Sequence, residues 1–407
     1  MTASRYFNNR LNSSEVGNGT AEGRKEYYFN NWMTLLSQLP LLLFTLLNSI
    51  LYPRISEKVR IAGSLVFILL LFVLTATLVM VPMEQDLFFS VTMATIWFIN
   101  SFGAVLQGSL FGLVALLPLR YSSVFMSGQG LAGTFAAVAL LFAIASEADD
   151  QSAALGYFIT PCVGTLVTLM SYLLLPKLVR VYSLLNQYTS VPANLNGPIS
   201  CSVANGNPCR EDGGVSRQAF VSLEVAVTKE TKSSVLEVLK KIWVMAFCVT
   251  FVFTVTLSVF PAITVDVKTV YQGKWEHYFT PVCCFLLFNL MDWFGRTVTT
   301  LLQWPRKESC WFPVLVVLRV VFIPLLMLCN VQERHFLPVI FNHDVIFIFI
   351  MVLFSASSGY FVCLSMSYAP QLVAPHDGET AGALMTFFLA LGLSLGAALS
   401  FLLRVIV

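Results

Sequence analysis

The sequence predicts an all-α membrane protein that crosses the bilayer many times. Of its 407 residues, 57% are hydrophobic and 11% are charged, whereas a soluble domain carries about 25% charged residues. The mean hydropathy is +0.76. Apolar segments long enough to cross a bilayer as helices recur along the chain. The net charge of +2 points to no particular class of partner.

Ten apolar segments are expected to form membrane helices. They lie approximately at 32–52, 61–81, 87–115, 123–145, 153–175, 242–264, 277–303, 311–330, 345–368 and 382–405.

The chain divides around a hydrophilic stretch, residues 181–240, that is rich in Ser, Asn, Gly and charge. This composition predicts a largely disordered loop. Before it lie a polar segment at 1–31 and a first bundle at 32–180; after it lies a second bundle at 241–407. Each bundle has five expected helices. Two bundles joined by a central inner loop are typical of secondary transporters, whose substrate site lies between the halves.

Charge in the short loops predicts how the chain sits in the membrane, because cytoplasmic loops carry an excess of Lys and Arg. If residues 1–31 face outward, basic residues gather in the inner loops and acidic residues in the outer ones. The long loop is then cytoplasmic, and the C-terminus is extracellular. The glycosylation sequons at Asn12 and Asn18 then face outward. Since the first segment is itself basic and not easily exported, we expect a further span upstream of it.

One helix face in the segment 277–303 carries three polar side chains. Asn289, Asp292 and Arg296 stand at i, i+3 and i+7, so they share that face. An ionisable residue at membrane depth costs roughly 2.5–3.5 kcal/mol, so this face must meet protein or water. One interpretation is an i,i+4 ion pair that joins helices. We favour the other, a polar site near the midplane for a hydrophilic solute.

Other polar groups lie inside the predicted spans. Asn100 and Gln107 share a face of the third span. Gln107 is either an interhelical hydrogen-bonding group, worth about 0.6 kcal/mol, or a ligand group with both a donor and an acceptor. Arg319 lies inside the eighth span and needs an acidic or carbonyl partner, for which Asp292 and Glu379 are candidates. We expect structural roles for Asn100 and Arg319.

Two further sequence features concern helix ends and packing. Phe260 and Pro261 end the sixth span, either as a simple helix end or as part of an extracellular gate. Small residues allow helices to approach closely. They occur as Gly108/Gly112, Gly378/Gly382, Gly392/Gly396 and the run Ser127–Gly133.

Motifs for enzymatic or ATP-driven chemistry are missing from the sequence. There is no Gly-x-x-x-x-Gly-Lys-Ser/Thr, His-Glu-x-x-His or Gly-x-Ser-x-Gly stretch. The nine cysteines show no metal-ligand spacing. Cys201 and Cys209, in the hydrophilic loop, are expected to be free thiols. We therefore expect a protein that is not an enzyme and that needs no metal or cofactor.

Several motifs resemble the vertebrate equilibrative nucleoside transporter family, and within it most closely the second paralogue. The likeness covers nearly all residues outside the hydrophilic loop. The matching runs are Pro40–Ser49, Asn100–Gly112, Ser127–Gly133, Phe288–Arg296 and Glu379–Ala383.

The resemblance implies an eleven-helix, major-facilitator-like fold with six spans before the central loop and five after it. The family's first helix is absent here, which leaves ten. The roles that it implies are ribose binding by Asp292 and Arg296, base recognition by Gln107, cavity lining by Leu41 and Asn289, outer closure by Phe260, and cytoplasmic gating by Glu379.

The expected function is facilitative, alternating-access transport of nucleosides such as adenosine and uridine, and of nucleobases as the paralogue carries them. Two alternatives stay open: proton-coupled nucleoside transport, and a short, non-transporting form that modulates a full-length transporter. The expected surroundings are the lipid bilayer of the plasma membrane, basolateral in polarised cells. No nucleic-acid partner is expected.

Overall fold

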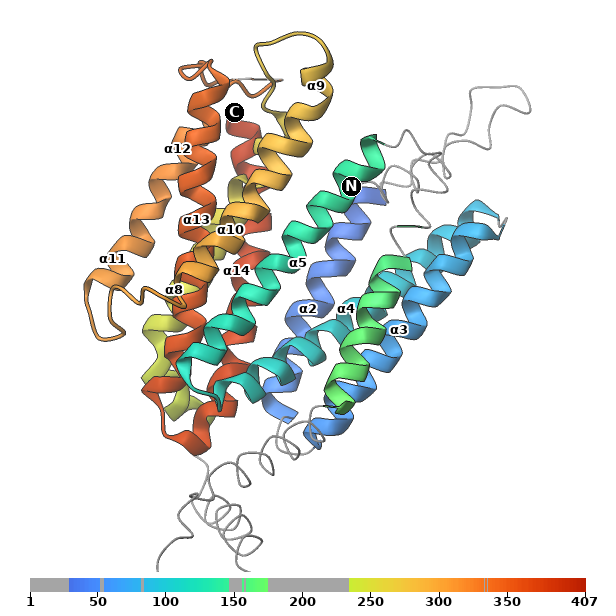
Figure 1. Ribbon diagram of the computed structural model, residues 1–407, viewed down its shortest axis with the longest axis vertical. Coiled ribbons are helices and arrows are strands. Elements are labelled where there is room, and N and C mark those ends of the chain that lie inside the picture. Colours follow the sequence, from blue (N-terminus) through green and yellow to red (C-terminus); the bar gives the residue numbers. More distant parts are fainter. Residues whose placement is uncertain are drawn as a thin grey trace, which may run out of the picture.

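A computed structural model describes residues 29–51, 55–81, 84–145, 156, 159–174, 234–332, 334 and 336–407. These residues are helical with connecting turns, and their only β-type pairings are isolated bridges. The helices run side by side as an elongated bundle (Figure 1). The sequons at Asn12 and Asn18 and nearly all of the loop 181–240, with Cys201 and Cys209, lie outside the described residues.

The N-terminal helices end at residues close to those expected. They are α2 (Phe29–Leu51), α3 (Glu57–Met80), α4 (Gln85–Ala115), α5 (Leu119–Ala145) and a helical stretch at Ile159–Leu174.

The C-terminal half contains both continuous and interrupted helices. The continuous ones are α8 (Val235–Val259), α13 (Asp344–Tyr368) and α14 (Gly378–Ile406). One interrupted span consists of α9 (Lys274–Phe279), the π-helical η4 (Thr280–Leu286) and α10 (Leu287–Val298). The other consists of α11 (Trp311–Leu318), η5 (Arg319–Val321) and α12 (Phe322–Met327). Short 3₁₀ turns η3 (Thr264–Asp266), η6 (Ala369–Leu372) and η7 (Pro375–Asp377) lie at the ends.

The ten predicted spans are confirmed as helical segments. Seven are long and apolar enough to cross a membrane, and three shorter apolar helices match the first, fifth and eighth predicted spans. Two of these spans are interrupted, one at η4 and the other at η5. Pro281 lies at the start of the π segment, and Pro324 lies in α12, and a proline lacks the N–H that continues a helical ladder.

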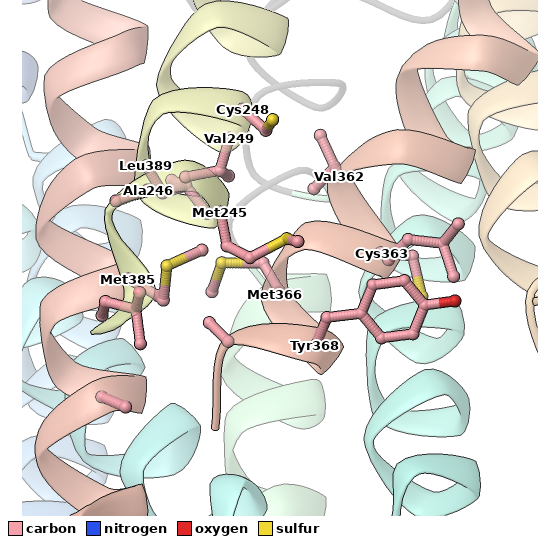
Figure 2. Packing of buried hydrophobic residues seen from close by; sticks show 14 of the residues in the cluster. Met245, Ala246, Cys248, Val249, Val362, Cys363, Met366, Tyr368, Met385 and Leu389 are labelled. Carbon is pink, nitrogen blue, oxygen red and sulfur yellow. The ribbon is translucent and has the colours of Figure 1, made fainter. Parts of the chain in front are cut away.

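The apolar core of the C-terminal half is rich in sulfur. Met245 on α8, Met366 on α13 and Met385 on α14 converge beside Tyr368 (Figure 2). All four side chains are almost fully buried. Methionine fills irregular gaps because it is unbranched and has three rotatable bonds.

Glycines set the closest approaches of α14. A Cβ at Gly392 would lie 2.5 Å from the carbonyl oxygen of Thr250 on α8, and one at Gly382 equally close to that of Phe111 on α4. Ser49 of α2 also donates a hydrogen bond to the carbonyl of Ala383 (3.1 Å). Helix α14 therefore packs against both halves, and the predicted glycine packing is confirmed at these positions.

Candidate functional site

The polar face of α10 forms an ion pair within its own helix. Arg296 donates from Nε to Oδ2 of Asp292 over 2.7 Å, and both side chains are 11% exposed. This is the i,i+4 geometry that the spacing predicted. Since the pair lies within a membrane-spanning segment, its charges partly neutralise each other where an isolated charge would be costly.

Helix α13 packs against α10 backbone to backbone at the level of this pair. A Cβ at Gly359 would lie 2.8 Å from the carbonyl carbon of Asp292, and one at Gly295 would lie 3.0 Å from the carbonyl carbon of Ala356. Any larger side chain at either glycine would separate the two helices. The glycines therefore fix the position of Asp292 relative to α13.

On another side, α10 contacts α5 through polar groups. Thr134 donates to the carbonyl of Asn289 (3.0 Å). The hydroxyl of Ser127 bonds that of Thr297 (2.8 Å) and accepts from Nε1 of Trp293 (3.2 Å). Sequence analysis gave no role to these hydroxyls, although the small-residue run containing Ser127 indicated packing. Helix α10 thus lies between α5 of the N-terminal half and α13 of the C-terminal half (Figure 1).

Asn289 lies on the α5 side of α10, where only glycine leaves it room. A Cβ at Gly133 would meet its side-chain oxygen and lie 3.4 Å from Cγ. Its amide nitrogen donates to the carbonyl of Phe285, within the π segment (2.8 Å). The amide oxygen of Asn289 therefore faces the boundary between the two halves.

An aromatic stack adjoins this polar face. Helix α8 ends at Val259, and the next residue, Phe260, stacks on Phe288 with ring centroids 3.8 Å apart. Phe260 also makes an edge contact with Phe285 (5.9 Å). Because Phe288 directly precedes Asn289, the predicted helix end also places an aromatic ring next to the candidate site.

The remaining predicted site residues lie on other helices. Leu41 on α2 and Gln107 on α4 are both half-buried. Asn100 donates to the carbonyl of Ile96 in its own helix (2.8 Å). Glu379 lies half-buried in the first turn of α14. These four residues lie on α2, α4 and α14, whereas Asp292 lies on α10.

Arg319 is fully buried where α11 gives way to η5, and its partners differ from the two acids considered. Its hydrogen bonds, among the residues that the structure covers, go to the hydroxyls of Ser357 and Thr256 (3.1 and 3.2 Å) and to the carbonyls of Val252 and Phe354 (3.1 and 3.2 Å). Carbonyl partners were expected and are found, whereas neither of the candidate acids, Asp292 and Glu379, accepts one of these four hydrogen bonds. Asp292 instead bonds the Arg296 one turn away.

Known proteins give a consistent comparison. A family model described as "Nucleoside transporter" matches residues 93–405. Equilibrative nucleoside transporter 2 of Rattus norvegicus is 52% identical over 99% of this chain and 92% of its own length. Human equilibrative nucleoside transporter 1 is 46% identical over 100% and 93%. A solved structure of the E. coli fucose:proton symporter FucP has a TM-score of 0.51 at 10% identity, covering 98% of this chain and 86% of that one.

The likeness to FucP concerns the fold alone. Together with the apolar helices long enough to cross a membrane, it shows a multi-pass helical fold like that of the major facilitator transporters. The family match and the whole-chain identities are more specific. The chain belongs to the nucleoside transporter family and is a transporter, not an enzyme.

Proposed function

We propose that this facilitative nucleoside transporter binds its substrate on the Asp292–Arg296 face of α10, between the two helix bundles. The observation that carries this proposal is the buried ion pair at the junction of α5, α10 and α13. Ionisable groups inside membrane spans mark solute pathways, since their insertion is otherwise unfavourable. Secondary transporters bind substrate at such an interface near the midplane.

The chemistry of this face suits a nucleoside. Arg296 occupies one carboxylate oxygen of Asp292, and the other oxygen can accept a hydrogen bond from a ribose hydroxyl. Arg296 uses only Nε in the pair, so its terminal nitrogens can also donate to the sugar. We further infer that Gln107 hydrogen-bonds the base and that Leu41 and Asn289 line the cavity. Phe260 closes the cavity on the outside, where Pro261 breaks the helix. Glu379 belongs to the cytoplasmic gate.

The decisive variant is Asp292→Asn, which keeps the shape of the side chain and removes its charge. A hydrogen bond to a charged group contributes roughly 1.5–3 kcal/mol, so uridine uptake should fall about 10-fold or more. Uptake is measured in proteoliposomes and normalised to the amount of folded protein. Glu237→Gln, on the exposed first turn of α8, removes the same charge and should transport normally.

This normalisation separates the two interpretations of the ion pair. If the pair only joined helices, Asp292→Asn would lower the melting temperature and the yield, while uptake per folded molecule stayed unchanged. That result would refute the assignment of Asp292 to the substrate site.

We also infer the orientation and a wider substrate range. Loop charge supports extracellular sequons and C-terminus, and a cytoplasmic loop at 181–240 between the bundles. The resemblance to the transporter family supports residence in the plasma membrane. Glycosidase treatment should increase the gel mobility of the unsubstituted chain and leave that of an Asn12→Gln/Asn18→Gln variant unchanged. An unchanged mobility of both proteins would contradict the orientation. The similarity to the second paralogue supports nucleobase transport, for which hypoxanthine should compete with uridine.

A further inference from the structure

The helix α9 and the C-terminal end of α14 lie at the same end of the C-terminal bundle (Figure 1). Residues from both, with those of the neighbouring loops, line a second polar site, a pocket. Its volume is about 520 Å³, within the range of about 300–1,000 Å³ typical of small-molecule sites. It lies away from the Asp292–Arg296 pair. Its polar lining includes Asp266, Lys268, Glu276, His277, Gln332 and Arg404.

The back wall of the pocket is held together by hydrogen bonds. Arg404, near the end of α14, pairs with Asp266 (3.0 Å) and donates to the carbonyl of Gln332 (3.3 Å). The backbone N–H of Gln332 donates to the carbonyl of Asp266 (2.9 Å). Lys268 donates its N–H to the carbonyl of Asn330 (3.0 Å). The loops around the pocket are therefore cross-linked before any ligand arrives.

The other charged groups of the lining leave polar side chains available to a ligand. Within the described ranges, the side chains of Lys268 and Glu276 have no ion-pair partner. The lining carries two carboxylates and two basic side chains, so its charges balance. A balanced lining with hydrogen-bond donors and acceptors suits a neutral molecule with several hydroxyls, and the exposed ring of His277 offers a flat surface for a heterocycle.

Two arms of the chain connect this pocket to the aromatic stack next to the candidate site. Asp266 ends η3, six residues after Phe260. Thr280, which also lines the pocket, begins the π segment that leads to Phe285. The thiol of Cys284 donates to the hydroxyl of Thr264 (3.2 Å), which ties the two arms together. A molecule in the pocket would therefore contact both segments that carry the rings of the stack.

We propose that this pocket is a second nucleoside-binding site, in which a substrate molecule docks before it passes the Phe260 stack. The inference rests on the proposed function, because it takes the same substrate. Balanced charge, hydroxyl-binding groups and direct connection to the gate segments support a nucleoside over an ion or a peptide. A nucleoside bound in the pocket would also contact Thr280 and so affect the conformation of the π segment, whose irregular hydrogen bonding allows local adjustment.

The test introduces a cysteine by Glu276→Cys in the full-length chain, purified in detergent. The rate of maleimide labelling is measured with and without uridine, relative to the unsubstituted chain, because Cys310 is exposed. Saturating uridine should slow labelling at least about 3-fold, since a bound molecule blocks access to the pocket. The same protection is expected in an Asp292→Asn background, where the central site is disabled. Labelling of Glu308→Cys, on the exposed loop after α10, should not respond to uridine in that background.

A second variant makes the test independent of the central site. Lys268→Met should raise the uridine concentration for half-maximal protection about 3- to 10-fold. Absence of protection at Glu276→Cys would overturn the proposal, as would protection that Lys268→Met does not weaken. Protection lost with Asp292→Asn would mean that the central site alone binds uridine. Failure of the central assignment would instead appear as normal uptake by Asp292→Asn.

Discussion

The backbone contact between α10 and α13 predicts a severe effect of Gly359→Ala. The added carbon would lie 2.8 Å from the carbonyl carbon of Asp292 and 3.0 Å from its Cα. Because carbon atoms pack at about 3.5–4.0 Å, the helices must separate by roughly 0.7 Å or more. The obstructing atoms are backbone, so no side-chain rotation relieves the overlap. Overpacking of this kind costs about 1–3 kcal/mol, occasionally more.

The assay compares melting temperature and uridine uptake of Gly359→Ala with those of Gly103→Ala. Gly103, on α4, is a helical glycine with no atom within 4 Å of an added Cβ. With roughly 2–4 °C per kcal/mol in domains of 150–250 residues, Gly359→Ala should melt several degrees lower and lose most uptake, while Gly103→Ala should behave normally. Equal melting temperatures and uptake in the two variants would refute the close packing of α10 on α13.

Two further predictions concern neighbouring groups. Phe260→Ala removes a stacked ring pair worth about 0.5–1.5 kcal/mol, so the KM for uridine influx should change roughly 2- to 12-fold. Phe260→Tyr keeps the ring, and its KM should stay close to normal. An unchanged KM in both variants would exclude a role of Phe260 in the gate. Arg319→Lys cannot reproduce the four hydrogen bonds of the guanidinium. It should lower the free energy of unfolding by about 1.5–3 kcal/mol, which is measured as a lower melting temperature. An unaltered melting temperature would show that those hydrogen bonds do not stabilise the protein.

Sequence patterns predicted the spans well because a bilayer imposes a length and a composition that any single segment reveals. The same holds for the Asp292–Arg296 pair, because i,i+4 neighbours meet in every helix. The resemblance of the motifs to those of the transporter family also gave candidate roles for Gln107 and Glu379. These roles remain predictions, because both residues lie on other helices than the pair, Gln107 on α4 and Glu379 on α14.

Contacts between distant segments could not be predicted in the same way. Arg319 was expected to find an acidic or carbonyl partner, but the sequence could not tell which; helix packing brings it hydroxyls and carbonyls from α8 and α13. No local sequence pattern indicated the partners of Ser127 or the second pocket. Both are formed by segments that include residues over a hundred positions apart in the chain. Such features depend on how the helices pack, which the periodicity of one helix does not contain.

The two neighbours of α10 differ in a way that bears on alternating access. Toward α13, the glycines meet backbone atoms, which cannot move independently of their helices. Toward α5, a Cβ at Gly133 would meet only the side chain of Asn289, while one at Gly130 would lie 2.9 Å from the Cα of Trp293 and 3.0 Å from Cδ of Arg296. The three hydrogen bonds to α5 are worth about 0.6 kcal/mol each, roughly 2 kcal/mol together. Because the α5 contact is the weaker one, α10 and α13 should move as one body while α5 separates, which exposes the polar face of Asp292 at the boundary that opens.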